Sequence, residues 1–327
     1  MITANTVYGA FCDSAKRWPD RAFLNVLPET AKIYEIASGE MSYADALAQI
    51  EILKTKINAA GYQRGQRIMF LLENRPSYFL WWLALNGLGI SVVPINPDLR
   101  EAELAYMIEH AEPVLAICLA DRCCELRGAA ECKGKSLNVV TPDATLPTVD
   151  TSLAIAERKG DPEAALLYTS GTTGNPKGCI LTNEYFIEAG RWYANATGIC
   201  ALNLEGERMI TPLPIFHMNA MAFSFMAMVA VGGCLTTLDR FHPRTWWESV
   251  RCAKATCLHY LGVMPSMLMG ADPSPHDQNH TVRFGFGAGI DPKLHAAFEE
   301  RFNIPLSEGW AMTETGAGGV ICANREP

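Results

Sequence analysis

The sequence predicts an α/β fold with a mostly parallel sheet flanked by helices. Helix-like apolar segments alternate with short runs rich in β-branched residues, and glycine or proline stands between them. Apolar residue types make up 49% of the 327 residues and charged types 19%, so the chain can bury a core, and intrinsic disorder is excluded. At about 150 residues per domain, the length predicts roughly two domains.

In the first half, the periodicity over residues 43–60 predicts a helix that ends at Gly61, because glycine is the usual residue after a helix C-terminus. Pro76 predicts the start of the next helix, where proline is tolerated. A further helix is expected over 100–110, and strands over 67–72, 91–95 and 114–119. Residues 120–160 are read as a connector, so the two domains are placed at 1–160 and 161–327.

The second half repeats this alternation of helices and strands. We expect strands over 165–169, 208–211, 234–238, 256–261, 282–286 and 304–308. We expect helices over 184–197, 219–231, 243–253 and 292–302, and a polar loop over 270–280. The uncharged run 218–238 is long enough to cross a membrane, but Gly232 and Gly233 divide it into a helix and a strand, so no stable membrane insertion is predicted.

Charge and cysteine content restrict the function class. The net charge of −8 argues against nucleic acids and anionic membranes as partners. The 11 cysteines form no CxxC pair, which favours reduced thiols and a cytoplasmic location over a disulfide framework or a metal site. Asp13 and Lys16 interrupt the region where a signal peptide would need an apolar core.

The segment Tyr168-Thr-Ser-Gly-Thr-Thr-Gly-Asn-Pro-Lys-Gly178 carries the strongest chemical signal. Its glycines let backbone N–H groups turn toward an anion, its hydroxyls add donors, and Lys177 adds positive charge. It is not a Walker A loop, because Lys177 is followed by Gly178 and not by Ser or Thr. Composition alone leaves two interpretations open, a phosphate-binding loop and a flexible surface turn.

Spelled out in full, this segment resembles the phosphate-loop signature of the adenylate-forming superfamily, which includes acyl-CoA synthetases, firefly luciferase and the adenylation domains of nonribosomal peptide synthetases. Three later segments are similar to that family's acyl-pocket motif, adenine-site turn and aromatic-x-x-Thr-Glu motif, in the family's order. They are Pro212-Leu-Pro-Ile-Phe-His217, Gly287-Ala-Gly-Ile-Asp291 and Gly309-Trp-Ala-Met-Thr-Glu-Thr-Gly316. Residues 255–315 most resemble the crotonobetaine/carnitine–CoA ligase group.

The resemblance implies the large N-terminal domain of the acyl-CoA synthetase-like fold, with two mostly parallel sheets flanked by helices. It implies ATP, Mg²⁺ and coenzyme A as cofactors, with Lys177, His217, Thr313 and Glu314 as the catalytic residues and Glu314 as the metal ligand. Trp310-Ala311 replaces the family's usual Tyr-Gly, and Trp310 keeps a flat face for adenine. The implied nucleotide-binding residues are Thr169, Ser170, Gly171, Thr172, Thr173, Gly174, Lys177, Gly287, Ala288, Gly289, Trp310, Ala311, Met312 and Thr313.

The acyl pocket is expected beside His217, which the family pattern makes a gate next to the substrate carboxylate, although a histidine satisfied in the core is the alternative outside this motif. The flexible and small residue types in this region suit a small or medium carboxylic acid. The expected pocket residues are His217, Met218, Asn219, Met221, Gly262, Val263, Met264 and Gly285. The methionines from Met218 onward have core packing as their alternative role.

The implied activity is that of an ATP-dependent carboxylate–CoA ligase acting through an acyl-adenylate. An amino-acid or aryl-acid adenylating domain, luciferase-like oxidation and a non-catalytic nucleotide-binding module are the alternatives, and His217 in place of an aspartate disfavours an amino-acid substrate. Because the family's ribose-binding Asp, hinge and C-terminal lysine have no counterpart in 1–327, we expect a chain that stops before the small C-terminal domain and is inactive or weakly active alone. The sequence leaves a homodimer open.

Overall fold

The computed structural model describes residues 2–149, 163–169, 174–316 and 321–323. The chain divides into two compact units, each built on one sheet. Unit 1 comprises 1–3, 13–45 and 188–327, and unit 2 comprises 4–12 and 46–187. The predicted boundary at 160/161 differs from this division, because the strand that begins at Ala22 pairs with a strand of the second half, and the strands around 163–182 pair with the first half.

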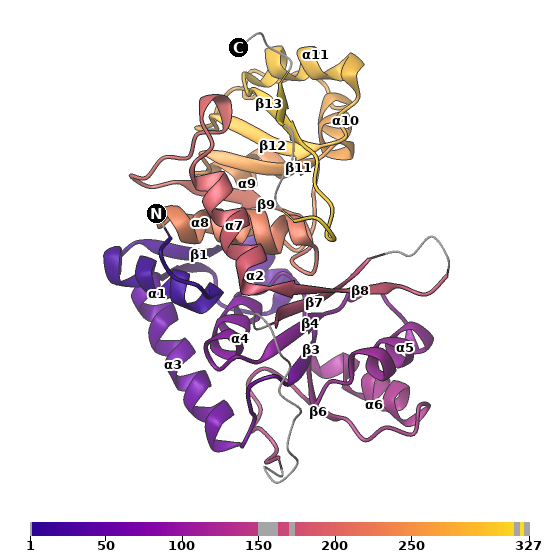
Figure 1. Cartoon of the computed structure of the whole chain (residues 1–327). Coiled ribbons are helices and arrows are strands. Elements are labelled where there is room, and N and C mark those ends of the chain that lie inside the picture. Colours follow the sequence, from indigo (N-terminus) through magenta and orange to yellow (C-terminus); the bar gives the residue numbers. More distant parts are fainter. Residues whose placement is uncertain (1, 150–162, 170–173, 317–320, 324–327) are drawn as a thin grey trace. The chain divides into compact units, whose positions relative to one another are not determined.

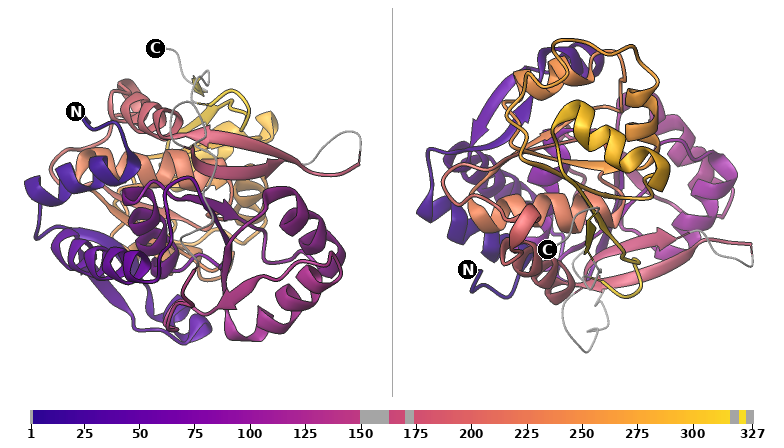
Figure 2. Two further views of the ribbon diagram at one scale, coloured as in Figure 1. Left: turned by 60° about the horizontal axis from the view of Figure 1, so that its bottom comes forward. Right: turned by 90° about the horizontal axis from the view of Figure 1, so that it is seen from above.

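Unit 2 contains a six-stranded sheet in the order β6-β5-β3-β4-β7-β8. All its neighbours are parallel except β7 and β8, which form an antiparallel hairpin. The strands are β3 (Arg67–Leu71), β4 (Ser91–Pro94), β5 (Leu115–Cys118), β6 (Asn138–Val140), β7 (Glu163–Thr169) and β8 (Lys177–Thr182). Both views in Figure 2 show the β7–β8 hairpin projecting as a two-stranded ribbon from this sheet.

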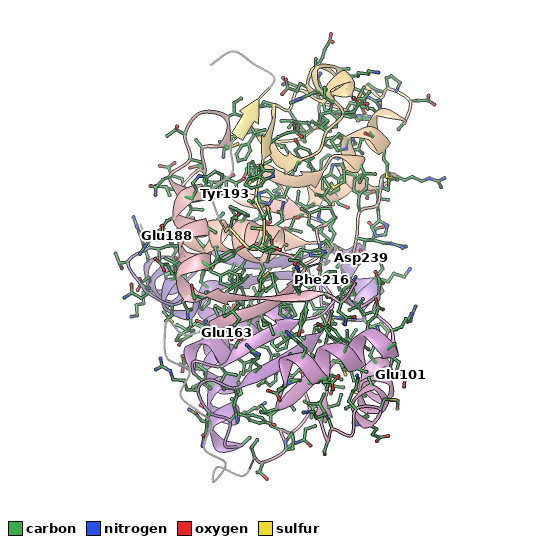
Figure 3. All side chains as sticks on the ribbon, turned by 45° about the vertical axis from the view of Figure 1, so that its right-hand side comes forward. Glu101, Glu163, Glu188, Tyr193, Phe216 and Asp239 are labelled. Carbon is green, nitrogen blue, oxygen red and sulfur yellow. The ribbon has the colours of Figure 1, made fainter. Side chains whose placement is uncertain are left out.

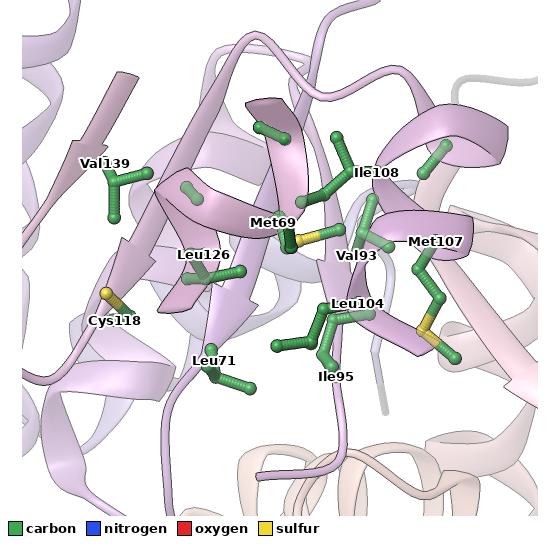
Figure 4. Close-up of a cluster of buried hydrophobic side chains, with 14 of the residues drawn as sticks. Met69, Leu71, Val93, Ile95, Leu104, Met107, Ile108, Cys118, Leu126 and Val139 are labelled. Carbon is green, nitrogen blue, oxygen red and sulfur yellow. The ribbon is translucent and has the colours of Figure 1, made fainter. Parts of the chain in front are cut away.

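The parallel strands of unit 2 require helical crossovers, and one face of the sheet packs against two of these helices. Leu104 and Ile108 of α5 and Leu126 of α6 meet Met69 and Val93 of the sheet in one buried cluster (Figure 4). The helical elements of this unit include α3 (Tyr43–Ala59), α4 (Pro76–Gly87), α5 (Glu101–Ala111), η1 (Ala120–Arg122) and α6 (Cys123–Glu131). Helix α4 is buried all round from Tyr78 to Asn86, as its unbroken apolar sequence predicts.

Unit 1 contains an eight-stranded sheet in the order β14-β13-β12-β11-β9-β10-β1-β2, parallel except at its two antiparallel edge strands (Figure 1). Its strands are β1 (Ala22–Val26), β2 (Gly39–Ser42), β9 (Arg208–Thr211), β10 (Cys234–Thr237), β11 (Cys257–Leu261), β12 (Phe284–Ala288), β13 (Leu306–Gly309) and β14 (Ile321–Ala323). Helices α1 (Val7–Arg17) and α7 (Asn183–Ala194) are divided between the two units. The other helical elements belong to unit 1 and are α2 (Pro28–Tyr34), η2 (Gly198–Cys200), η3 (Asn219–Ser224), α8 (Phe225–Val231), α9 (Trp246–Cys252), α10 (Val263–Met269) and α11 (Pro292–Phe302). The expected α/β fold with two mostly parallel sheets is confirmed.

Most predicted elements are present, and the differences have local causes. The connector expected over 120–160 contains α6 and β6, and its residues 150–162 lie outside the described part of the chain. The helix expected over 219–231 begins as the π-helix η3 and continues as α8. Among the described residues, no helix has the length and hydropathy needed to cross a membrane, and the apolar run 218–238 folds as η3, α8 and β10.

A buried ion pair joins two strands of the unit 2 sheet. Arg67 on β3 donates from Nε and Nη2 to the two carboxylate oxygens of Glu163 on β7, at 2.7 Å each. Ser91 Oγ on β4, the strand between them, also donates to Glu163 Oε1 at 2.7 Å. Both charged side chains are about 10% exposed, so their charges are compensated mainly by each other.

We predict that Glu163→Ala lowers the free energy of unfolding by about 3–5 kcal/mol, because it leaves the Arg67 guanidinium buried without its carboxylate. The matched control is Glu188→Ala, which removes the carboxylate of an ion pair that is 35% and 53% exposed and should cost no more than about 0.5 kcal/mol. Figure 3 labels both carboxylates. Urea denaturation of the two variants measures the contrast, and equal losses would contradict the role given to burial.

Candidate functional site

The phosphate-loop segment lies at the tip of the β7–β8 hairpin. Thr169, the last residue of β7, pairs directly with Lys177, the first residue of β8, so the exposed Lys177 side chain stands at the mouth of the connecting turn. Gly174 has a φ of +120°, a backbone conformation that favours glycine. The expected ligands Ser170, Gly171, Thr172 and Thr173 lie outside the described residues.

Helix α5 contacts this hairpin at the end that carries the turn. Tyr106 donates its hydroxyl to the carbonyl of Pro176 at 3.0 Å, and His110 Nδ1 lies 2.8 Å from the Tyr168 hydroxyl. Burial raises the pKa of Tyr168, so its hydroxyl stays protonated at neutral pH and can take part in this hydrogen bond. The strands that carry Thr169 and Lys177 are therefore held in place by contacts within unit 2.

In unit 1, the predicted adenine-site residues lie where three neighbouring parallel strands end. Strands β11, β12 and β13 are adjacent and parallel, so their carboxyl ends meet at one edge of the sheet. The backbone N–H of Gly262, which follows β11, donates to the carbonyl of Ala288 at the end of β12, at 2.8 Å. This is the edge at which open α/β sheets bind their ligands.

Glycines permit the close backbone contacts at this edge. A Cβ atom on Gly262 would lie 1.7 Å from the carbonyl oxygen of Gly289, and one on Gly287 would lie 2.2 Å from the carbonyl oxygen of Tyr260. Gly289 has a φ of +79°. The turn after it is held by Glu308 on β13, whose Oε1 accepts the Ile290 N–H at 2.8 Å. Any larger residue at 262 or 287 would therefore shift the strand ends.

The segment after β13 presents Trp310 and the predicted metal ligand. The Trp310 side chain is 59% exposed, which leaves its ring accessible to a planar ligand. Met312 and Gly316 form an isolated bridge that closes a tight turn, with Glu314 exposed and Thr313 and Ala311 half-buried. The described residues contain no cluster of three metal-binding side chains, but a single carboxylate suits Mg²⁺ that takes its other ligands from phosphates and water.

The predicted acyl segment begins at His217, whose imidazole lies 4.4 Å from the Phe216 ring, centroid to centroid. Desolvation by the surrounding protein lowers the pKa of His217, although part of the side chain is exposed, so the neutral imidazole dominates at pH 7. Met218 is half-buried, whereas Met221 is fully buried in the core, in agreement with its alternative packing role. The segment then enters the π-helix η3, a geometry often found at functional sites.

A buried polar cluster, which we call the His259 cluster, lies under η3 and consists of His259, Tyr193, Ser224 and Asn219. His259 Nε2 lies 3.0 Å from the Tyr193 hydroxyl. Its Nδ1 lies 2.7 Å from Ser224 Oγ and 3.1 Å from Asn219 Oδ1. The Tyr193 and His259 rings stack with an interplanar angle of 8° and both contact Phe286 (Figure 3 labels Tyr193). Complete burial lowers the pKa of His259 to about 3, so the ring is neutral.

The structure does not bring all expected pocket residues to this side of the sheet. Side chains alternate along a strand, so His259 faces Asn219 while Leu258 and Tyr260 point to the opposite face. Gly285 lies on that opposite face, because its Cβ position would meet Leu306 at 2.6 Å and Leu258 at 3.0 Å. Met264 is buried there too, in a small apolar cavity lined also by Tyr260, Leu268 and Phe298. The exposed Val263 and the buried Gly262 lie at the strand edge itself.

Two residues of this region were missed from the sequence. Glu308 was expected only as a strand residue, and its bond to the Ile290 N–H depends on two strands brought together by the sheet. His259 sits in an apolar strand without a neighbouring polar motif, and its partners come from α7 and η3. The one signal in the sequence was that His259 stands between large apolar residues in a predicted buried strand. A polar side chain at such a position needs buried hydrogen-bond partners.

A known protein family matches nearly the whole sequence, including the segments that carry the strand-end glycines, Trp310 and Lys177. The family model described as AMP-binding enzyme matches residues 11–327. The chain therefore belongs to the AMP-binding enzyme family, in agreement with the predicted adenylate-forming superfamily.

Known proteins similar to this chain include CoA ligases. Sulfoacetate–CoA ligase of Cupriavidus necator is 31% identical over 93% of this chain and 58% of its own length. Crotonobetaine/carnitine–CoA ligase of Salmonella arizonae is 27% identical over 89% of this chain and 59% of its own length. The chain thus spans less than two thirds of these relatives. The crystal structure of the N-terminal domain of FACL13 from Mycobacterium tuberculosis superposes with a TM-score of 0.79, at 19% identity, over 97% of this chain and 78% of that one.

We predict that His259 makes stability depend on pH. Its pKa is about 3 in the folded state and near 6.5 when unfolded, so the unfolded chain binds the extra proton between these values and stability falls as pH drops below about 6.5. One such group accounts for about 1.4 kcal/mol between pH ~7.5 and pH ~5.5. Urea denaturation at both pH values should show this loss reduced in His259→Gln relative to the unsubstituted chain. An identical pH dependence in the two proteins would contradict the neutral buried state.

Proposed function

We propose that this chain is the nucleotide- and acid-binding part of an ATP-dependent carboxylate–CoA ligase. The observation that carries the proposal is the edge of the unit 1 sheet, where Ala288 and Gly289 end one strand and the exposed Trp310 follows the next. A glycine-floored edge beside an accessible aromatic ring fits a flat nucleobase. The family match and the CoA ligases among the relatives support the same activity.

The proposed reaction has two steps whose atoms balance. A carboxylate oxygen of the acid attacks the α-phosphorus of ATP, forming the acyl–phosphate bond and releasing pyrophosphate. The thiol of CoA then attacks the acyl carbon, so the thioester forms, AMP leaves and the thiol proton passes to solvent. Neither step needs a nucleophile from the protein, so its residues act by orienting the reactants and compensating charge.

Each region has a proposed role in the first step. The turn between Thr169 and Lys177 binds the β- and γ-phosphates, and Lys177 compensates the charge that develops on the leaving pyrophosphate. Thr313 donates to the α-phosphate, and Glu314 holds Mg²⁺, which supplies charge neutralisation to the phosphates when bound. His217 lies beside the acid and is neutral at pH 7. A positively charged imidazole would attract the carboxylate and oppose its attack on the phosphorus, and the neutral ring does not.

Binding of nucleotides to this chain tests the proposal directly. Titration calorimetry with ATP, AMP and a non-reactive acyl-sulfamoyl-adenosine, which replaces the acyl phosphate by a sulfamate, separates the nucleobase from the phosphates and the acyl group. We expect the acyl-sulfamoyl-adenosine to bind more tightly than AMP, because it occupies the acid and adenosine sites together. No saturable binding of any of the three would rule out the proposed function.

We predict that Lys177→Ala weakens ATP binding about tenfold, or about 1.4 kcal/mol, while AMP binding changes little, since only ATP carries the β- and γ-phosphates. The control is Lys293→Ala, which removes the same charge from an exposed position at the start of α11. Calorimetric titrations of both variants with both nucleotides give the ratio. Equal weakening of ATP and AMP by Lys177→Ala would contradict the phosphate role.

We predict that Glu314→Gln raises the Mg²⁺ concentration needed for half-maximal ATP binding by about tenfold, because the neutral amide is a poor ligand for a hard cation. The control is Glu300→Gln, an equally isosteric change at an exposed helix position. The measurement is ATP affinity as a function of MgCl₂ concentration. Superimposable titrations of Glu314→Gln and the unsubstituted chain would remove Glu314 as the ligand.

A further inference from the structure

The His259 cluster has one arrangement of hydrogens that satisfies every member. The neutral imidazole has one donor and one acceptor nitrogen. Among the described residues, His259 Nε2 is the acceptor within reach of the buried Tyr193 hydroxyl, so Tyr193 donates to Nε2 at 3.0 Å. Nδ1 then carries the hydrogen, and it faces Ser224 Oγ at 2.7 Å and Asn219 Oδ1 at 3.1 Å.

This assignment determines how the Asn219 amide is turned. An Nδ1–H donor requires the oxygen of the Asn219 amide, not its nitrogen, to face His259. Ser224 Oγ in turn donates to the Asn219 backbone carbonyl at 3.4 Å, which ties the first residue of η3 to the last. The Asn219 NH₂ group is therefore directed away from the cluster, and it makes no hydrogen bond to the described part of the chain.

An amide NH₂ without a protein partner on a half-buried residue can donate to water or to a ligand that replaces the water. Asn219 is the first residue of η3, and it lies two residues after His217, the residue predicted to be next to the substrate carboxylate. We propose that His259 is a positioning residue that fixes the Asn219 amide so that its NH₂ group donates to an acceptor oxygen on the acyl group of the substrate. The substrate class is then a small carboxylic acid that carries an oxygen acceptor in place of a plain hydrocarbon chain, a conclusion that rests on the proposed ligase function.

The chemistry of discrimination follows from desolvation. A hydrocarbon acyl group would cover the Asn219 NH₂ without replacing its water, and a buried unsatisfied donor costs about 1–3 kcal/mol. An ether oxygen at the same place accepts the hydrogen bond with nearly the same volume as a methylene. The ratio of the affinities for an ether analogue and its methylene partner therefore depends on the orientation of the Asn219 amide. The fit of the acyl chain affects both analogues alike.

The experiment measures the binding of matched acyl-sulfamoyl-adenosines to this chain by titration calorimetry. Methoxyacetyl is paired with butanoyl, and 3-methoxypropanoyl with pentanoyl, so that the oxygen is placed at two positions. We expect at least one ether analogue to bind about tenfold more tightly than its hydrocarbon partner. Asn219→Leu should reduce that ratio to about one while keeping the adenosine-dependent affinity.

A change at Tyr193, which contacts the His259 nitrogen opposite to the one that faces Asn219, tests whether His259 positions the Asn219 amide. Tyr193→Phe removes the hydroxyl that holds the hydrogen on Nδ1, so the ring can change tautomer, the Asn219 amide can turn over, and the ether preference should fall at least threefold. The matched control is Tyr43→Phe, which removes another buried tyrosine hydroxyl of unit 1, one that contacts the carbonyls of Met228 and Gly233. Tyr43→Phe should keep the ether preference.

The outcomes separate this inference from the proposed function. Tight binding of all analogues with equal affinity for ether and hydrocarbon partners would overturn the inference and leave the ligase proposal intact. Failure of every analogue to bind would overturn the proposed function and the inference with it. An ether preference that survives Asn219→Leu would assign the donor to another residue and reject Asn219, and one lost in Asn219→Leu but kept in Tyr193→Phe would reject the role of the cluster.

Discussion

The candidate site of unit 1 depends on the absence of side chains where its parallel strands end. The Gly262 backbone can approach the Gly289 carbonyl closely only because Gly262 has no Cβ, and Gly287 can approach the Tyr260 carbonyl for the same reason. These contacts bring the ends of β11 and β12 together, and the Glu308 carboxylate joins the turn after β12 to β13. The position of Trp310 follows from this arrangement, since it directly continues β13.

Buried polar groups give each unit a second constraint. In unit 2, Arg67 and Glu163 compensate each other across β3 and β7, with Ser91 between them. In unit 1, His259 stays neutral and shares its two nitrogens among three partners. Burial without these partners would be costly, so the strands and helices that carry them can pack in only one register. In unit 1 these hydrogen bonds fix the position of Asn219, which is proposed to bind the acyl group.

The sequence predicted the features that depend on local residue patterns. It did not predict those that depend on how strands pair and which face of a sheet each side chain occupies. Gly61 and Pro76 mark helix ends that the structure confirms, because capping and proline geometry are local effects. Strand β8 was missed, since its first residues Lys177 and Gly178 were read as part of the phosphate-loop segment and Leu181 is its single buried residue. Gly285 was expected to border the acyl pocket, but strand alternation places it on the opposite face from His259.

The π-helix explains why the acyl segment could not be read from an ordinary helical pattern. In an α-helix, two residues five positions apart differ in direction by about 140°, so Asn219 and Ser224 would not face the same partner. The wider turn of η3 brings both toward His259 Nδ1 and lets Ser224 Oγ reach the Asn219 carbonyl. Hydrogen bonds to His259 on β11 thus accompany the π-helical geometry of η3. A change at His259 would therefore alter the acyl segment, and it would also reach Phe286 on β12, the strand that leads into the adenine-site turn.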